Sequence, residues 1–191
     1  MTGNILKFIL GMLFAPTVIL LHESSHYLTA RALGLTPAFH AAKNTFQVPK
    51  EGLSERKNFV VTIAGPLVEA TLGSVGICWL WRLRSKRRMT PATAIDWLAT
   101  FFAICAGRWL RCVTGTPTHP QPGDEARLSA DLGLPHWFLP YFLAPFSLLI
   151  LGTAIYLHPT GSRLIPFASV ILGGCVGSFL WVNYLGPRLL P

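Results

Sequence analysis

Charged residues are scarce in this chain of 191 residues, and that scarcity limits the kinds of protein it can be. They make up 13% of the sequence while hydrophobic residues make up 51%, whereas soluble domains carry about 25% charged residues. The composition therefore predicts an integral membrane protein. The length favours one domain over residues 1–191 rather than two.

Acidic residues and paired cysteines are also scarce. The chain has 8 Asp+Glu against 16 Lys+Arg, and its 4 cysteines form no C-x-x-C pair. Neither a disulfide framework nor a cysteine zinc site is therefore indicated. The basic residues gather at the ends of apolar runs, above all in RLRSKRR (82–88), which favours lipid head groups over nucleic acid. We expect membrane lipids, and no nucleic acid, as partners.

Long apolar runs, by contrast, recur along the chain. A helix needs about 20 such residues to cross the hydrocarbon core of a membrane. Five spans are predicted, at about residues 4–33, 59–81, 93–113, 137–157 and 164–185. Pro16 is expected to kink the first span, and Pro140 and Pro145 to break the fourth, because proline removes a helical hydrogen bond. The fifth is expected to end at Gly186-Pro187. The sequence thus predicts an all-α, multi-pass integral membrane protein.

Two connections between these spans are more than simple turns. Residues 35–57 have some two-residue alternation and are predicted to form a short membrane-associated β-hairpin. Within 114–136, a short helix is predicted to begin at Asp124 and to stop at Gly133. With five spans, both connections lie on the same side of the membrane as the end of the first span. Basic residues occur on both sides, so charge does not decide the orientation.

Ionisable residues interrupt the first apolar run in LLHESSHYL (20–28). Residues four apart on a helix lie on one face, so His22 and His26 can present two imidazole nitrogens to one metal ion. Glu23 lies beside them and could act as a general base towards a water molecule at that metal. A catalytic zinc site of this type needs a third protein ligand, which the motif itself does not contain.

The depth of this motif in the membrane bears on its role. At 1.5 Å per residue, His22 lies roughly 26 Å along the helix axis from Ile5, which places it below the membrane surface. The two histidines could simply bond to carbonyl groups of neighbouring helices. However, three ionisable residues within five positions of a membrane helix are difficult to explain by packing, because each is costly there. We therefore predict metal binding, with Zn²⁺ as the expected ion.

Three stretches of the chain resemble the site-2 protease family of intramembrane zinc metalloproteases. HESSH (22–26) lies in one hydrophobic run, and AGPLVEA (64–70) in the next run resembles that family's A-G-P segment. PGDEARL (122–128) brings an acidic residue about a hundred positions after the histidines. This resemblance covers about residues 1–145. It implies an α-helical membrane core with submerged zinc, and cleavage of a substrate's transmembrane helix.

The resemblance also implies that an acidic residue in this third stretch completes the zinc site. We assign that role to Asp124. The family's usual L-D-G around the ligand aspartate is absent, so Asp131 and Glu125 stay as alternatives. A simpler role for Asp124 is to cap the short helix that follows it.

Three residues of the second stretch are auxiliary candidates. Glu69 stands three residues after the proline, where the family often carries asparagine. Its carboxyl could act as a general acid, pair with Arg108, or touch the metal. Gly65 and Pro66 allow two interpretations, which are a kink or close helix contact, and a broken helix end that presents backbone groups near the metal.

The leading functional prediction is a zinc-dependent intramembrane endopeptidase, with a transmembrane protein as its substrate. One alternative is a membrane-embedded metalloenzyme that acts on a lipid or small hydrophobic molecule. The other is a non-catalytic metal-binding relative. Glu23 disfavours this last alternative, because metal binding alone does not require that carboxylate.

Overall fold

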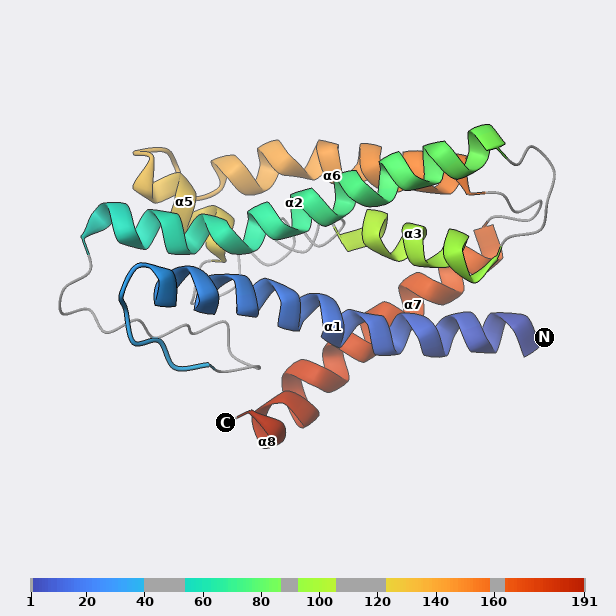
Figure 1. Ribbon diagram of the computed structural model, residues 1–191, viewed down its shortest axis with the longest axis horizontal. Coiled ribbons are helices and arrows are strands. Elements are labelled where there is room, and N and C mark those ends of the chain that lie inside the picture. Colours follow the sequence, from blue (N-terminus) through green and yellow to red (C-terminus); the bar gives the residue numbers. More distant parts are fainter. Residues whose placement is uncertain (1, 40–53, 87–92, 106–122, 159–163, 191) are drawn as a thin grey trace. The chain divides into compact units, whose positions relative to one another are not determined.

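The computed structural model describes residues 2–39, 54–86, 93–105, 123–158 and 164–190. Every regular element within these ranges is helical (Figure 1). By length and composition, 4 helices could cross a membrane, at Gly3–Ala32, Glu55–Ser85, Phe138–Leu157 and Ile165–Leu189. The all-α prediction therefore holds for the described chain, and these helices are compatible with a multi-pass membrane protein.

Two parts of the predicted fold lie largely outside the described residues. The span expected at 93–113 begins as α3 (Ala94–Cys105), a shorter apolar helix, and its continuation is not described. Most of the hairpin expected at 35–57 is likewise not described, although residues 55–57 belong to the first turn of α2 (Glu55–Lys86). The span at 93–113 and the hairpin both stay predictions.

The prolines interrupt the helices less than the sequence suggested. Pro16 lies inside α1 (Thr2–Ala32), which is one helix throughout. The predicted break in the fourth span is wrong, because α6 (Phe138–Leu157) continues past Pro145. Pro140 falls in the first turn of α6, where amide groups have no intrahelical partner and a missing N–H costs little.

Contacts divide the chain into two compact units, which are described separately. The first comprises Met1–Gly65 and Leu164–Pro191, and the second comprises Pro66–Arg163. Their boundary falls inside α2, which continues as one helix past Gly65 and Pro66. This division concerns packing, and the prediction of a single domain stays a prediction.

The first unit is built on α1 and α7 (Leu164–Leu180), which cross one another (Figure 1). A π-helix, η2 (Trp181–Leu185), and the short α8 (Gly186–Leu189) continue α7. The expected stop at Gly186-Pro187 is therefore wrong. Pro187 lies in the first turn of α8, where proline is well tolerated.

Glycines allow the backbones of α1 and α7 to touch. A Cβ atom added to Gly173 would lie 2.0 Å from the Phe8 carbonyl oxygen, and one added to Gly11 would lie 2.2 Å from that of Val170. A side chain at either position would therefore overlap the backbone of the facing helix. Close packing through small residues is a common way for helices to associate in membranes.

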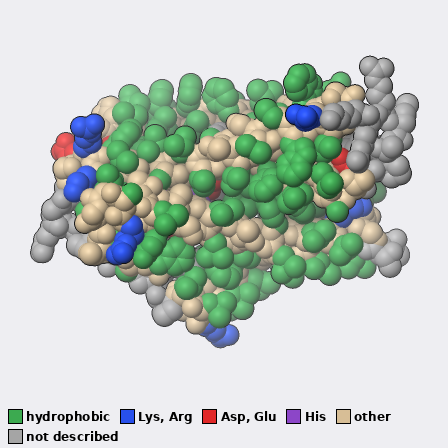
Figure 2. Space-filling model, viewed as in Figure 1, with side chains coloured by type: hydrophobic (Ala, Val, Ile, Leu, Met, Phe, Trp, Pro, Cys, Tyr) green, Lys and Arg blue, Asp and Glu red, His purple; other side chains and the backbone are tan. Residues whose placement is uncertain are grey.

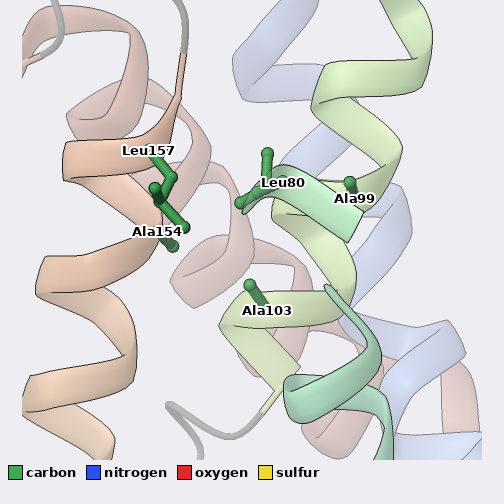
Figure 3. Packing of buried hydrophobic residues seen from close by; sticks show 5 residues of the cluster. All are labelled: Leu80, Ala99, Ala103, Ala154 and Leu157. Atoms are coloured by element: carbon green, nitrogen blue, oxygen red, sulfur yellow. The ribbon is translucent and has the colours of Figure 1, made fainter. Parts of the chain in front are cut away.

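The second unit contains the rest of α2 with α3, α5 (Asp124–Asp131) and α6. Its core is a cluster of small and branched apolar side chains that point toward one another from α2, α3 and α6 (Figure 3). The buried members are Leu80, Ala99, Ala103, Ala154 and Leu157. The alanines allow these helices to approach closely around Leu80.

Polar contacts fix helix ends in the second unit. Thr93 and Asp96 form a capping box at the start of α3, where the Asp96 carboxylate accepts the Thr93 N–H at 2.6 Å. Near the C-terminal end of α2, the Arg84 guanidinium donates to the Tyr156 carbonyl of α6. It also lies 4.2 Å from the centre of the Tyr156 ring. One arginine of RLRSKRR therefore contacts protein.

Hydrophobic side chains also cover much of the visible surface, where only a few Lys and Arg side chains are seen (Figure 2). Leu13, Leu67, Leu149 and Leu172, from four helices, are each at least 58% exposed. Exposed apolar surface of this extent is expected where lipid replaces water as the solvent.

Candidate metal centre

Two histidines of α1 converge on one point. His22 and His26 are separated by one turn of α1, and their Nε2 atoms lie 3.0 Å apart. Their rings meet edge to face, with centroids 4.7 Å apart, and both side chains are buried. Zinc binds imidazole nitrogen at about 2.0–2.1 Å. Two nitrogens at this separation can therefore share one ion with only a small adjustment.

The neighbouring helix determines which nitrogen of His26 carries hydrogen. His26 Nδ1 lies 2.7 Å from the carbonyl oxygen of Val61 in α2. A carbonyl oxygen can only accept a hydrogen bond, so Nδ1 is the protonated nitrogen and donates to it. In the neutral ring, Nε2 then carries the lone pair, and this lone pair faces His22. Histidines that bind metals are commonly oriented by such a hydrogen bond from the other ring nitrogen.

Gly65 makes room for both imidazoles. A Cβ atom at this position would lie 2.5 Å from His26 Nε2 and 2.6 Å from His22 Nε2. The backbone of α2 thus passes directly beside the two nitrogens, and only glycine leaves that space open. Because α2 is continuous here, the interpretation of Gly65 and Pro66 as a broken helix end is wrong. Close helix contact, the other interpretation, describes Gly65.

A second contact holds the end of α1 against the start of α2. Lys57 Nζ donates to the Leu33 carbonyl oxygen at 3.3 Å. Gly34, with φ of 76°, allows α1 to end in a turn whose amides bond back to the last helical carbonyls. Together with the His26–Val61 hydrogen bond, this contact orients the two helices around the histidine pair.

Glu23 lies in the same turn of α1 and is 4% exposed. Its side chain is therefore buried. Its sequence position places it next to His22 rather than on the i, i+4 face shared by the histidines. This placement suits a group that acts on a molecule held at the site.

Asp124 and the two histidines, all within the described part of the chain, form a group that could hold a metal ion. Each offers one ligand atom, and these atoms lie within 4.8 Å of one another. Two imidazoles and a carboxylate match the donors of many zinc sites.

The three acidic candidates for the third zinc ligand differ in their position and burial in α5. Gly123, not Asp124, is the N-cap residue of α5, and Asp124 is its first residue. The simpler role of Asp124 as a helix cap is therefore wrong. Glu125 is buried, with a carboxylate oxygen 3.5 Å from the place a Cβ of Gly123 would take, whereas Asp131 is exposed at the end of the helix. Gly133 does end α5 with φ of 71°, as predicted.

Glu69 is buried in α2, at 1% exposure, one turn after Gly65. It is outside the ligand group of His22, His26 and Asp124. Arg108, its suggested partner, lies outside the described residues. Glu69 thus adds a buried carboxyl to α2 whose role stays a prediction.

The contribution of Val61 could not be found from the sequence. Its carbonyl orients His26, and every residue has such a carbonyl, so no residue type marks the position. The sequence predicts Gly65 as an auxiliary residue, but its contact with both imidazoles depends on the packing of α2 on α1.

Comparisons of this chain with protein-family models, with curated proteins and with solved structures each found no match. Its function is therefore inferred from its residues and their geometry.

Proposed function

We propose that this protein is a zinc-dependent intramembrane endopeptidase, similar to the site-2 protease family. In this proposal it hydrolyses a peptide bond in or near a transmembrane helix of its substrate. The observation that carries the proposal is the approach of the His22 and His26 Nε2 atoms to 3.0 Å. They lie on a helix long and apolar enough to cross a membrane. An H-E-x-x-H motif on a helix is typical of zinc peptidases.

Each residue of the site has a role in this proposal. His22, His26 and Asp124 would hold the ion, which would supply Lewis-acid activation of water and of the scissile carbonyl. The Glu23 carboxylate takes the proton from the attacking water and delivers it to the departing amide nitrogen. Burial of Glu23 keeps bulk water from competing for that proton. Gly65 leaves open the space beside the two imidazoles.

The surroundings of the motif support a substrate that lies within the membrane. Leu21 and Leu28, close to either end of HESSH, are 41% and 64% exposed. Apolar side chains beside buried histidines fit an approach from lipid better than an approach from water. The backbone of a transmembrane substrate is protected by its own hydrogen bonds, so local unwinding must precede cleavage.

A second candidate is a membrane-embedded metalloenzyme that acts on a lipid or a small hydrophobic molecule. The buried carboxyl of Glu69 favours it, because hydrolysis of a peptide with Glu23 as general base does not require another acid on α2. The non-catalytic metal-binding protein is disfavoured by Glu23, which metal binding alone does not need.

The proposal is tested with the Glu23→Gln and His22→Ala variants of the full-length protein in detergent micelles. Zinc content would be measured by atomic emission, and turnover with a fluorogenic transmembrane peptide and with an ester lipid in parallel. We expect Glu23→Gln to keep its zinc and His22→Ala to lose it. Turnover of the transmembrane peptide is expected to fall at least 100-fold in both, since general acid–base catalysis contributes about 10²–10⁴-fold.

Exposed residues of the same types provide the controls. Glu55→Gln, at the start of α2, and His136→Ala, before α6, change exposed side chains and are expected to retain zinc and activity. Full peptidase activity in Glu23→Gln would reject the enzyme mechanism. Turnover of the lipid but not of the peptide, lost in Glu23→Gln, would favour the second candidate.

A further inference from the structure

We propose that Ser129 is a positioning residue for the metal centre, which holds the helix that carries Asp124. This inference rests on the proposed function, because it requires Asp124 to be a metal ligand. It concerns α5 and α6, two neighbouring helices of the second unit (Figure 1).

Ser129 is completely buried and makes two hydrogen bonds. Its Oγ donates to the Glu125 carbonyl oxygen at 2.9 Å and accepts the Leu139 N–H at 3.0 Å. A hydroxyl has one hydrogen to donate and lone pairs to accept, so both bonds can exist together. Ser129 thereby connects the first turn of α5 with the first turn of α6.

The start of α6 depends on this hydroxyl. Amide groups in the first turn of a helix have no intrahelical partner and usually bond to the side chain of the N-cap residue. The N-cap residue of α6 is Trp137, which makes no such side-chain bond. Ser129, from another helix, supplies the acceptor for Leu139 instead. The hydroxyl is therefore a cap for α6 as well as a contact of α5.

The helix that carries Asp124 is short, and its position depends on such anchors. It has 8 residues, and helices of this length are marginal without tertiary contacts. Ala126 and Leu128 provide buried apolar contacts, and Ser129 provides the polar contact to α6. Asp124 begins this helix, about 7.5 Å along its axis from Ser129. Glu125, whose carbonyl Ser129 bonds, follows Asp124 directly.

Loss of the Ser129 hydroxyl should therefore weaken metal binding through Asp124. Neither hydrogen bond of this hydroxyl is to a proposed ligand atom, so its effect would come from the placement of α5. Residues that orient metal ligands typically contribute 10–100-fold to metal affinity. We expect the zinc affinity of Ser129→Ala to fall about tenfold, towards the lower end of that range.

The experiment measures the affinity of full-length protein in detergent for zinc alone, by competition with a chelating dye. Ser169→Ala is the matched control, because the half-buried Ser169 of α7 also donates to the carbonyl four residues earlier, but in an exposed hydrogen bond. Its zinc affinity should stay within about twofold of the parent, because α7 carries none of the proposed ligands. Ser129→Cys, which keeps the volume but bonds weakly, replaces Ser129→Ala if that variant does not fold, with the same expectation.

A double variant separates positioning from general destabilisation. If Ser129 acts through Asp124, adding Ser129→Ala to Asp124→Ala causes no further loss of zinc affinity. Parent affinity in Ser129→Ala, or an undiminished further loss in the double variant, would overturn the inference. If Asp124→Ala alone binds zinc as the parent does, the ligand assignment in the proposed function fails, and the inference fails with it. Weaker binding in Asp124→Ala alone with parent affinity in Ser129→Ala rejects only the role of Ser129.

Discussion

At the scale of single residues, Gly65 shows how a missing side chain can define a site. A methyl group at this position would overlap both His22 and His26. The Val61 carbonyl, one turn earlier in α2, orients His26. The site therefore depends as much on the backbone of α2 as on the side chains of α1.

We predict that Gly65→Ala loses zinc while the protein still folds. The added methyl would lie 2.5 Å from His26 Nε2, in the space that an ion shared by the two imidazoles needs. We expect a fall of at least tenfold in zinc affinity, comparable to the loss of an orienting contact.

Gly152→Ala in α6 is the control, since a Cβ there meets nothing within 4 Å. Alanine in an open helical position should leave zinc binding unchanged and stabilise the helix by up to about 1 kcal/mol. Zinc affinity would be measured by chelator competition, and stability by thermal unfolding. Unchanged zinc affinity in Gly65→Ala would mean that the imidazoles do not share an ion beside α2.

At the scale of the elements, the sequence predicted where helices lie better than where they stop. The expected break at Pro140 and Pro145 did not occur, and the fifth span continued past Gly186 to Leu189. Helix propensity describes an isolated segment. Membrane helices tolerate proline when neighbouring groups bond to the backbone carbonyl that proline leaves without a partner. The glycine stop at Gly133 was predicted correctly because its positive φ is a local requirement of the turn.

The crossing of α1 and α7 yields a prediction about stability. Gly173→Ala would place a methyl 2.0 Å from the Phe8 carbonyl oxygen, whereas a Cβ on the adjacent Gly174 lies 3.9 Å from its nearest neighbour, the Gly11 oxygen. Overpacking of this kind typically costs about 1–3 kcal/mol. Denaturant titration in micelles should therefore show Gly173→Ala destabilised by that amount and Gly174→Ala within about 0.5 kcal/mol of the parent. Equal stabilities would contradict the close crossing.

At the scale of the whole molecule, composition and hydropathy indicate the solvent in which the folded chain is stable. Its long helices bury few of their apolar side chains. In the most apolar 18-residue stretch of each of the four helices, only 17% to 39% is buried. A chain with so much exposed apolar surface is expected to need lipid around it. The few ionisable residues that are buried, such as His22, Glu23 and Glu69, are correspondingly informative, since each is costly in such surroundings.

Metal binding should stabilise the folded chain as a whole. An ion that binds only the native state adds about 2.7 kcal/mol at a free concentration of 100 times its Kd. The unfolding temperature in micelles should therefore rise when zinc is added and fall when a chelator is added. His22→Ala should unfold at the same temperature with and without zinc, and His136→Ala should respond as the parent does. A zinc response in His22→Ala equal to that of the parent would place the ion elsewhere.

The features that depend on neighbouring residues along the chain can be predicted from the amino-acid sequence alone. These are the apolar helices, the pairing of His22 and His26 on one face, and the turn at Gly133, since hydropathy and helical period act within a segment. Tertiary packing was needed to show that Val61 orients His26 and that Gly65 lies against both imidazoles. Those contacts join residues far apart in the chain, and packing between helices, rather than any local pattern, selects them.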